Sequence, residues 1–100
     1  MDLACGHLAA LERLFRQPDS FTVNLGTGRG VSVLEAVAAF EAACDKKIPV
    51  RFSARRPGDV ASCYASPESA QALLGWRAEK QLAEMCADHW RWQRNHPNGY

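Results

Sequence analysis

The sequence predicts an α/β fold of about four helices and two short strands, in a sheet that the chain itself does not complete. Four segments place apolar residues at helical spacing and are bounded by residues typical of helix ends. Two short runs between these segments are rich in β-branched and aromatic residues, which is typical of strands. The hydrophobic content of 47% is ordinary for a folded domain.

The N-terminal part is predicted to contain one helix and one strand. The helix runs from Asp2 to about Phe15, and Pro18 lies beyond its end because proline cannot continue a helix. Residues 21–25 form a short β-rich run that Gly26 closes. The apolar stripe of this helix consists of Leu3, Ala10, Leu11 and Leu14.

A second helix has the clearest start in the chain. Ser32 and Glu35 have the spacing of a capping box, in which the hydroxyl and the carboxylate each satisfy a free backbone N–H group. This helix is expected to end near residues 45–47. Its predicted buried face consists of Val33, Val37, Phe40 and Cys44.

The C-terminal half is predicted to contain a strand and two helices. Residues 48–53 form the second strand, in which Pro49 favours an edge position. The third helix starts at residues 66–68, where serine, proline and glutamate are typical of a helix start, and ends at Gly75. The fourth helix is marked by apolar residues from Leu82 and runs to about residue 95.

Two strands separated by a helix are too few for an independently stable sheet. We therefore expect the chain to be a C-terminal piece of a larger α/β protein, with Met1 an internal methionine of the complete chain. A dimer that completes the sheet is the alternative.

Composition restricts the class of partner. The formal net charge of +1 does not favour nucleic acid, and no apolar run approaches the ~18 residues of a membrane span. The N-terminus lacks the basic start and apolar core of a signal peptide, so a cytoplasmic location is expected. The four cysteines are far apart and have no metal-ligand spacing with the histidines, so we expect buried free thiols and no metal.

The segment Arg55-Arg56-Pro57-Gly58-Asp59 is the candidate binding site. Its guanidinium groups can donate two parallel hydrogen bonds to a phosphate, while the carboxylate can accept from a hydroxyl group. The alternative is a solvated turn with an Arg–Asp ion pair, worth at most ~1 kcal/mol. The residues alone leave both interpretations open.

No complete catalytic set is visible in the sequence. Gly26, Gly28 and Gly30 lie between a predicted strand and a helix, but Val31 at the sixth position breaks the G-x-G-x-x-G fingerprint for dinucleotides. A glycine-rich entry into the helix is the better explanation. Neither His7 nor His89 has a serine or cysteine nucleophile in a local motif, so no catalytic residue is predicted.

Six ordered blocks, spread over essentially the whole chain, resemble the C-terminal part of UDP-glucose 4-epimerases, a family of extended short-chain dehydrogenase/reductases. These blocks are Met1-Asp2-Leu3-Ala4-x-Gly6-His7, Asn24-Leu25-Gly26-Thr27-Gly28, Ser32-Val33-Leu34-Glu35, Arg55-Arg56-Pro57-Gly58-Asp59, Leu74-Gly75-Trp76 and Trp90-x-Trp92-Gln93.

The resemblance implies a Rossmann domain that carries NAD and a smaller C-terminal domain that closes over a UDP-sugar. Residues 1–30 are then the last helix and strand of the Rossmann-side region, and residues 31–100 form the C-terminal substrate domain. The family interconverts UDP-glucose and UDP-galactose through a 4-keto intermediate with NAD. A homodimer is expected for the complete enzyme.

The resemblance also implies roles for three residues: Arg56 binds the diphosphate, Asp59 contacts the uridine ribose, and Cys63 lines the pocket near the sugar. A thiol leaves more room than a tyrosine, so N-acetylated UDP-hexosamines are a further hypothesis for a complete enzyme. The NAD fingerprint and the Tyr-x-x-x-Lys pair of the family lie upstream of the matched part, so we expect no activity from the isolated chain. Another nucleotide-sugar epimerase or decarboxylase, and a non-catalytic truncated paralogue acting by protein interaction, are the alternatives.

Overall fold

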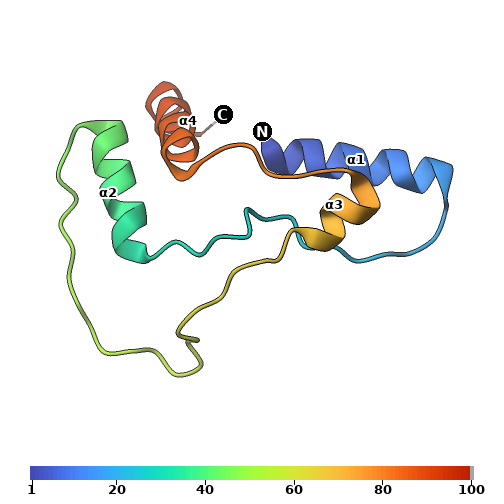
Figure 1. Cartoon of the computed structure of the whole chain (residues 1–100). Coiled ribbons are helices and arrows are strands. Elements are labelled where there is room, and N and C mark those ends of the chain that lie inside the picture. Colours follow the sequence, from blue (N-terminus) through green and yellow to red (C-terminus); the bar gives the residue numbers. More distant parts are fainter. Residues whose placement is uncertain (100) are drawn as a thin grey trace. The chain divides into compact units, whose positions relative to one another are not determined.

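The computed structural model describes residues 1–99 and contains four α-helices within them (Figure 1). The helices are α1 (Asp2–Arg16), α2 (Val33–Cys44), α3 (Glu68–Leu74) and α4 (Leu82–Asn95). The chain divides into two compact units. Unit 1 comprises Met1–Gly30 and Ser62–Glu79, and unit 2 comprises Val31–Ala61 and Lys80–Tyr100.

The two predicted strands are wrong, since residues 21–25 and 48–53 are irregular and no strand occurs within residues 1–99. A strand exists only through hydrogen bonds to a neighbouring strand, and these runs find no such neighbour in the described part of the chain. Their β-rich composition is therefore not sufficient to form a sheet. The predicted helices are all present, with ends within a few residues of those expected.

Unit 1 is held together around Trp76, which is only 8% exposed. Its indole Nε1 donates a hydrogen bond of 3.1 Å to the carbonyl oxygen of Asp2. The carboxylate of Asp2 accepts a second bond, of 2.8 Å, from the backbone N–H of Glu79. A Cβ atom on Gly6 of α1 would lie 2.7 Å from Leu25 and 3.3 Å from Trp76. The absence of a side chain at residue 6 therefore lets α1 approach its neighbours closely.

Unit 2 is built on the packing of α2 against α4 (Figure 1). The rings of Phe40 and His89 meet edge to face, with centroids 5.7 Å apart. The ammonium group of Lys46 lies 6.0 Å from the ring centre of Trp90. Cys86 of α4 is the buried thiol of this unit, at 2% exposure. Of the four cysteines, it alone fulfils the expectation of a buried thiol, because Cys5 and Cys63 are exposed and Cys44 is partly buried.

The predicted capping box of α2 is confirmed. The hydroxyl of Ser32 accepts from the Glu35 backbone N–H, and the Glu35 carboxylate accepts from the Ser32 N–H at 2.7 Å. The predicted buried face is wrong at Val33, which is 79% exposed, and no residue of α2 is buried in the structure described. Val33 is exposed because the burial of a helical side chain depends on what packs against that face of the helix, which its spacing alone does not specify.

The ends of α3 and α4 also rest on local chemistry. Gly75 ends α3 in the left-handed conformation with φ of 64°, as its sequence position predicted. Ser66 accepts a weak bond of 3.4 Å from the Glu68 N–H, although Pro67 occupies the N-cap position itself. Gln81 and Glu84 form a second capping box at α4. None of the described helices is long and apolar enough to span a bilayer.

Candidate functional site

The turn at residues 56–59 brings Arg56 and Asp59 together. The backbone N–H of Asp59 donates to the carbonyl oxygen of Arg56 at 3.3 Å, which closes the turn. Pro57 and Gly58 occupy its two central positions, and Gly58 has φ of 87°. A Cβ atom on Gly58 would touch nothing within 4 Å. Glycine is therefore favoured here by the backbone angle and not by lack of space.

The side chains of Arg56 and Asp59 form an ion pair across this turn. Arg56 Nε lies 3.2 Å from Asp59 Oδ2, and the two side chains are 85% and 42% exposed. An exposed pair of this kind contributes at most ~1 kcal/mol, so a ligand can break it at little cost. The terminal N–H groups of the guanidinium remain open to solvent and can donate to phosphate oxygens. Arg55 is exposed and makes no hydrogen bond or ion pair with the described residues.

Cys63 belongs to unit 1, whereas Arg56 and Asp59 belong to unit 2. Its thiol is free and exposed. The structure therefore brings together two of the three predicted site residues and leaves Cys63 to be described by itself. Its role in a sugar pocket stays a prediction.

The glycine-rich loop of unit 1 packs against residues 64–67. Cβ atoms would lie 2.8 Å from Ala65 if placed on Gly26, and 3.0 Å from Pro67 if placed on Gly28. Gly28 also has φ of 74°. Its glycines are thus accounted for by contact with the chain itself, and the residues present do not fit an NAD site.

A groove of about 530 Å³ in unit 1 is another concave surface with charged residues. It is lined by α1 from Ala9 onward and by residues 73–75. Its guanidinium groups already have partners within the unit. Arg13 lies 2.8 Å from Asp19 and over the ring of Phe21, at 4.8 Å, while Arg16 pairs with Glu12. The sequence did not predict these contacts of Arg13, because Asp19 and Phe21 lie beyond the end of α1, in a segment for which a turn and a strand were expected.

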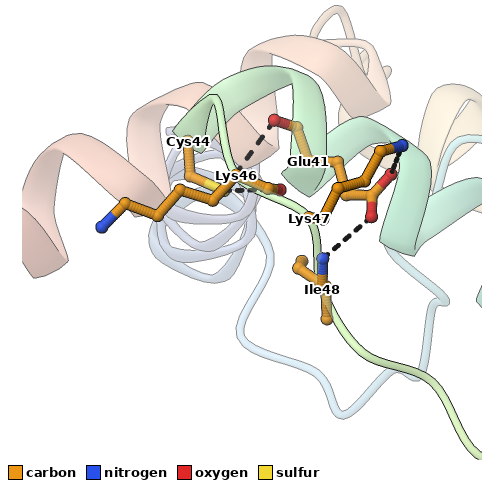
Figure 2. Close-up of polar contacts among 5 residues, drawn as sticks. All are labelled: Glu41, Cys44, Lys46, Lys47 and Ile48. Carbon is orange, nitrogen blue, oxygen red and sulfur yellow. Dashed lines mark hydrogen bonds and ion pairs between the residues drawn. The ribbon is translucent and has the colours of Figure 1, made fainter.

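Glu41 of α2 is an acid whose pKa is shifted by its contacts (Figure 2). One carboxylate oxygen accepts from the backbone N–H of Ile48 at 2.9 Å, and the other contacts Lys47 Nζ at 3.0 Å. The bond from Ile48 and then the contact with Lys47 lower the pKa of Glu41 below its usual 4.5, against the opposing effect of its burial. These contacts fix the chain that follows α2 and provide no catalytic group.

The two histidines for which no catalytic role is predicted both have structural contacts, His7 within its own helix and His89 with α2. His7 Nδ1 lies 2.7 Å from the carbonyl oxygen of Leu3, one turn earlier in α1. His89 packs on Phe40. Among the described residues, no group of three or more His, Cys, Asp and Glu side chains could hold a metal ion.

Sequence comparison links the whole chain to one kind of enzyme. The chain is 53% identical over 100 residues to UDP-glucose 4-epimerase of Bacillus subtilis and 54% identical to that of Homo sapiens. It is also 53% identical to a bifunctional UDP-glucose 4-epimerase and UDP-xylose 4-epimerase of Pisum sativum. Each match covers all of this chain but only 29–30% of the relative. No family model matches the chain.

Solved structures give the same result. The fold matches a crystal structure of UDP-glucose 4-epimerase from Bifidobacterium longum in complex with NAD⁺ and UDP, with a TM-score of 0.86 and 44% identity. A second UDP-glucose 4-epimerase structure matches with a TM-score of 0.91 and 35% identity. Both matches cover 99% of this chain and 29–30% of the solved chain. The resemblance inferred from the six blocks is confirmed, and it concerns the C-terminal part of such enzymes.

Proposed function

We propose that this chain, which is similar over its whole length to the C-terminal part of UDP-glucose 4-epimerases, is the substrate-binding portion of such an enzyme. The complete protein interconverts UDP-glucose and UDP-galactose through a 4-keto intermediate, using NAD. The observation that carries this proposal is 53–55% identity to epimerases over the whole length of the chain, together with a shared fold.

In this proposal the turn of unit 2 recognises the nucleotide. Arg56 donates to the diphosphate, because a planar guanidinium matches phosphate oxygens, and Asp59 accepts from a ribose hydroxyl. Their weak, exposed ion pair supports these roles, since UDP can replace the pair without leaving a buried charge behind. Cys63 lines the sugar pocket of the complete enzyme, where a small thiol also admits N-acetylated UDP-hexosamines.

The cofactor belongs to the part of the enzyme that this chain does not span. The B. longum structure is named as a complex with NAD⁺ and UDP, whereas the glycine loop here is occupied by the chain's own residues. Residues 1–30 belong to the Rossmann side and residues 31–100 to the substrate side. The complete enzyme is cytoplasmic and forms a homodimer.

A second substrate class is supported by one relative. The P. sativum protein is named for both UDP-glucose and UDP-xylose 4-epimerase activity and is 53% identical to this chain. UDP-xylose lacks the hydroxymethyl group of a hexose but carries the same nucleotide. The nucleotide-binding turn described above would serve both sugars.

The test is a chimaera in which this chain replaces the matching C-terminal part of the B. subtilis enzyme. We expect the chimaera to convert UDP-galactose to UDP-glucose and the isolated chain to show no turnover. Arg56→Ala in the chimaera should weaken UDP binding by ~1.5 kcal/mol, or roughly tenfold, measured by calorimetry. Arg55→Ala is the matched control, since Arg55 is adjacent and also exposed.

A folded chimaera that binds UDP but turns over neither UDP-hexose nor UDP-xylose would contradict the proposed activity. Equal effects of the two arginine variants would contradict the role of Arg56 and leave the activity standing.

A further inference from the structure

The turn at residues 56–59 is held in shape by its own residues. In the described structure, the hydrogen bonds of residues 49–65 are the closing bond from the Asp59 N–H to the Arg56 carbonyl oxygen and the contact between the two side chains. Residues 45–64 are all exposed, and Figure 1 shows the stretch between α2 and α3 that contains them as an irregular segment. The shape of the turn is therefore set locally and not by packing against the rest of the described chain.

The two central residues of the turn restrict its backbone in different ways. The ring of Pro57 holds φ at about −65°. Gly58 has φ of 87°, a left-handed value that residues with a Cβ atom rarely adopt. A Cβ atom at residue 58 would meet nothing within 4 Å, so neighbouring atoms do not exclude a side chain. The need for glycine at this position therefore comes from the backbone angle alone.

We propose that Gly58 is a positioning residue for nucleotide binding: its left-handed backbone keeps Arg56 and Asp59 adjacent at the two ends of the turn before UDP binds. This inference rests on the proposed function, in which Arg56 donates to the diphosphate and Asp59 accepts from a ribose hydroxyl. Gly58 acts only through these two side chains. A turn that is already formed avoids the loss of affinity that ordering it on binding would cause.

Alanine at residue 58 disfavours the observed backbone angle. Because no other part of the described chain packs on the turn, the ligand-free variant relaxes to a turn with negative φ at this residue. UDP then binds only the fraction of molecules in which the original turn has been restored, and the apparent affinity falls by that fraction. The stability of the ligand-free protein changes little, because the turn is exposed and contributes no buried contact.

The test measures UDP binding by calorimetry in the chimaera described above. Gly58→Ala should weaken binding roughly five- to tenfold. Gly58→Asn should bind within about twofold of the unaltered chimaera, because asparagine is the side chain best tolerated at a left-handed turn position. The melting temperature without UDP should be the same for both variants and the unaltered chimaera, which a purely structural role of Gly58 does not predict.

Gly99→Ala is the matched control. Gly99 has φ of 85°, and a Cβ atom there would also meet nothing within 4 Å. Its N–H closes a turn after α4 by donating to the His96 carbonyl oxygen at 3.1 Å. The same substitution is therefore made at the same kind of backbone position, in a turn that carries none of the proposed binding residues. UDP binding of this variant should be unchanged.

Two further measurements distinguish positioning from other effects. Gly58→Ala should raise KM for UDP-galactose with little change in kcat, because the turn binds the nucleotide equally in the ground state and the transition state. The double variant Arg56→Ala/Gly58→Ala should bind UDP less weakly than the product of the two single effects predicts. Such non-additivity is expected when one residue acts through the other.

Several results would overturn the inference: UDP affinity unchanged by Gly58→Ala, equal weakening by Gly58→Asn or by Gly99→Ala, or a fall of several degrees in the melting temperature of the ligand-free Gly58→Ala protein. If Arg56→Ala still weakens UDP binding in those cases, the proposed function stands and only the role of Gly58 fails. A folded chimaera that does not bind UDP would overturn both.

Discussion

Glu41 shows at the residue scale how one carboxylate holds a segment that has no secondary structure. Its two oxygens accept from the Ile48 backbone N–H and the Lys47 ammonium group (Figure 2). Each of these bonds is made better by the charged carboxylate than by the protonated acid. The chain after α2 therefore depends on a charge at Glu41.

This charge gives unit 2 a pH dependence whose sign can be worked out. The pKa of Glu41 is lower in the folded state than in the unfolded chain, so its bonds contribute stability above about pH 4.5 and lose it as pH falls through the folded pKa. We expect Glu41→Gln to reduce the loss of stability between neutral pH and pH 3. Urea unfolding of the chimaera at the two pH values, followed by circular dichroism, measures this loss of stability.

Glu12→Gln is the control for this variant, because Glu12 is 68% exposed and contacts only the exposed Arg16 in the described structure. An NMR titration in which the Glu41 carboxyl changes at or above the usual pH for glutamate would contradict the expectation.

The sequence predicts the partner of a polar side chain only where that partner is near in the chain. Arg56 and Asp59 are three residues apart across a Pro-Gly turn, and both the turn and the pair were foreseen. Arg13 and Asp19 are separated by a helix end, and Trp76 reaches back to Asp2 across most of the chain. Such contacts depend on the path of the backbone, which no local pattern specifies.

At the scale of the element, α1 depends on a glycine where helix propensity alone would favour another residue. A Cβ atom on Gly6 would lie 2.7 Å from Leu25 and 3.3 Å from Trp76. Alanine would gain up to about 1 kcal/mol of helix propensity, which offsets part of the crowding. A larger side chain cannot be accommodated in this way, because it would displace both neighbours.

We expect Gly6→Leu to destabilise unit 1 by about 2 kcal/mol, within the range of overpacking a close contact. Ala4→Leu, at an exposed position of the same helix, is the control and should have little effect. Trp76 is the natural reporter, since its indole loses a buried environment and its bond to Asp2. Tryptophan fluorescence during urea unfolding of the chimaera compares the two variants, and equal midpoints would contradict the packing argument.

Helices were predicted well because their signals are contained in the elements themselves. Ser32 and Glu35 satisfy each other's backbone groups three residues apart, and Gly75 adopts its left-handed conformation without help from elsewhere. The prediction of strands at residues 21–25 and 48–53 was wrong because a strand forms only by hydrogen bonding to a neighbouring strand, which the run itself cannot supply. The exposure of Val33 has the same origin, since burial depends on what lies opposite the helix.

At the scale of the whole molecule, the chain has little buried surface with which to hold itself together. Its two units each contain about half of the 100 residues, and the buried hydrophobic side chains in the described part are Ala70, Trp76 and Cys86. Domains of this size are marginal even with a well-formed core. A cooperative transition requires that the parts of a molecule lose their contacts together.

We therefore expect the isolated chain to unfold gradually in urea, with an apparent m-value below the ~1 kcal/mol/M at the low end for small cooperative domains. In the chimaera, the same residues should unfold with the rest of the protein, because their exposed apolar side chains are then covered. Circular dichroism at 222 nm reports the helices, and hydrogen exchange reports protection residue by residue. The controlled comparison is between the free chain and the same 100 residues in the chimaera. A single sharp transition of the free chain, with amide protection as high as in the chimaera, would contradict this expectation, because a chain with so few buried side chains would then unfold cooperatively without a partner.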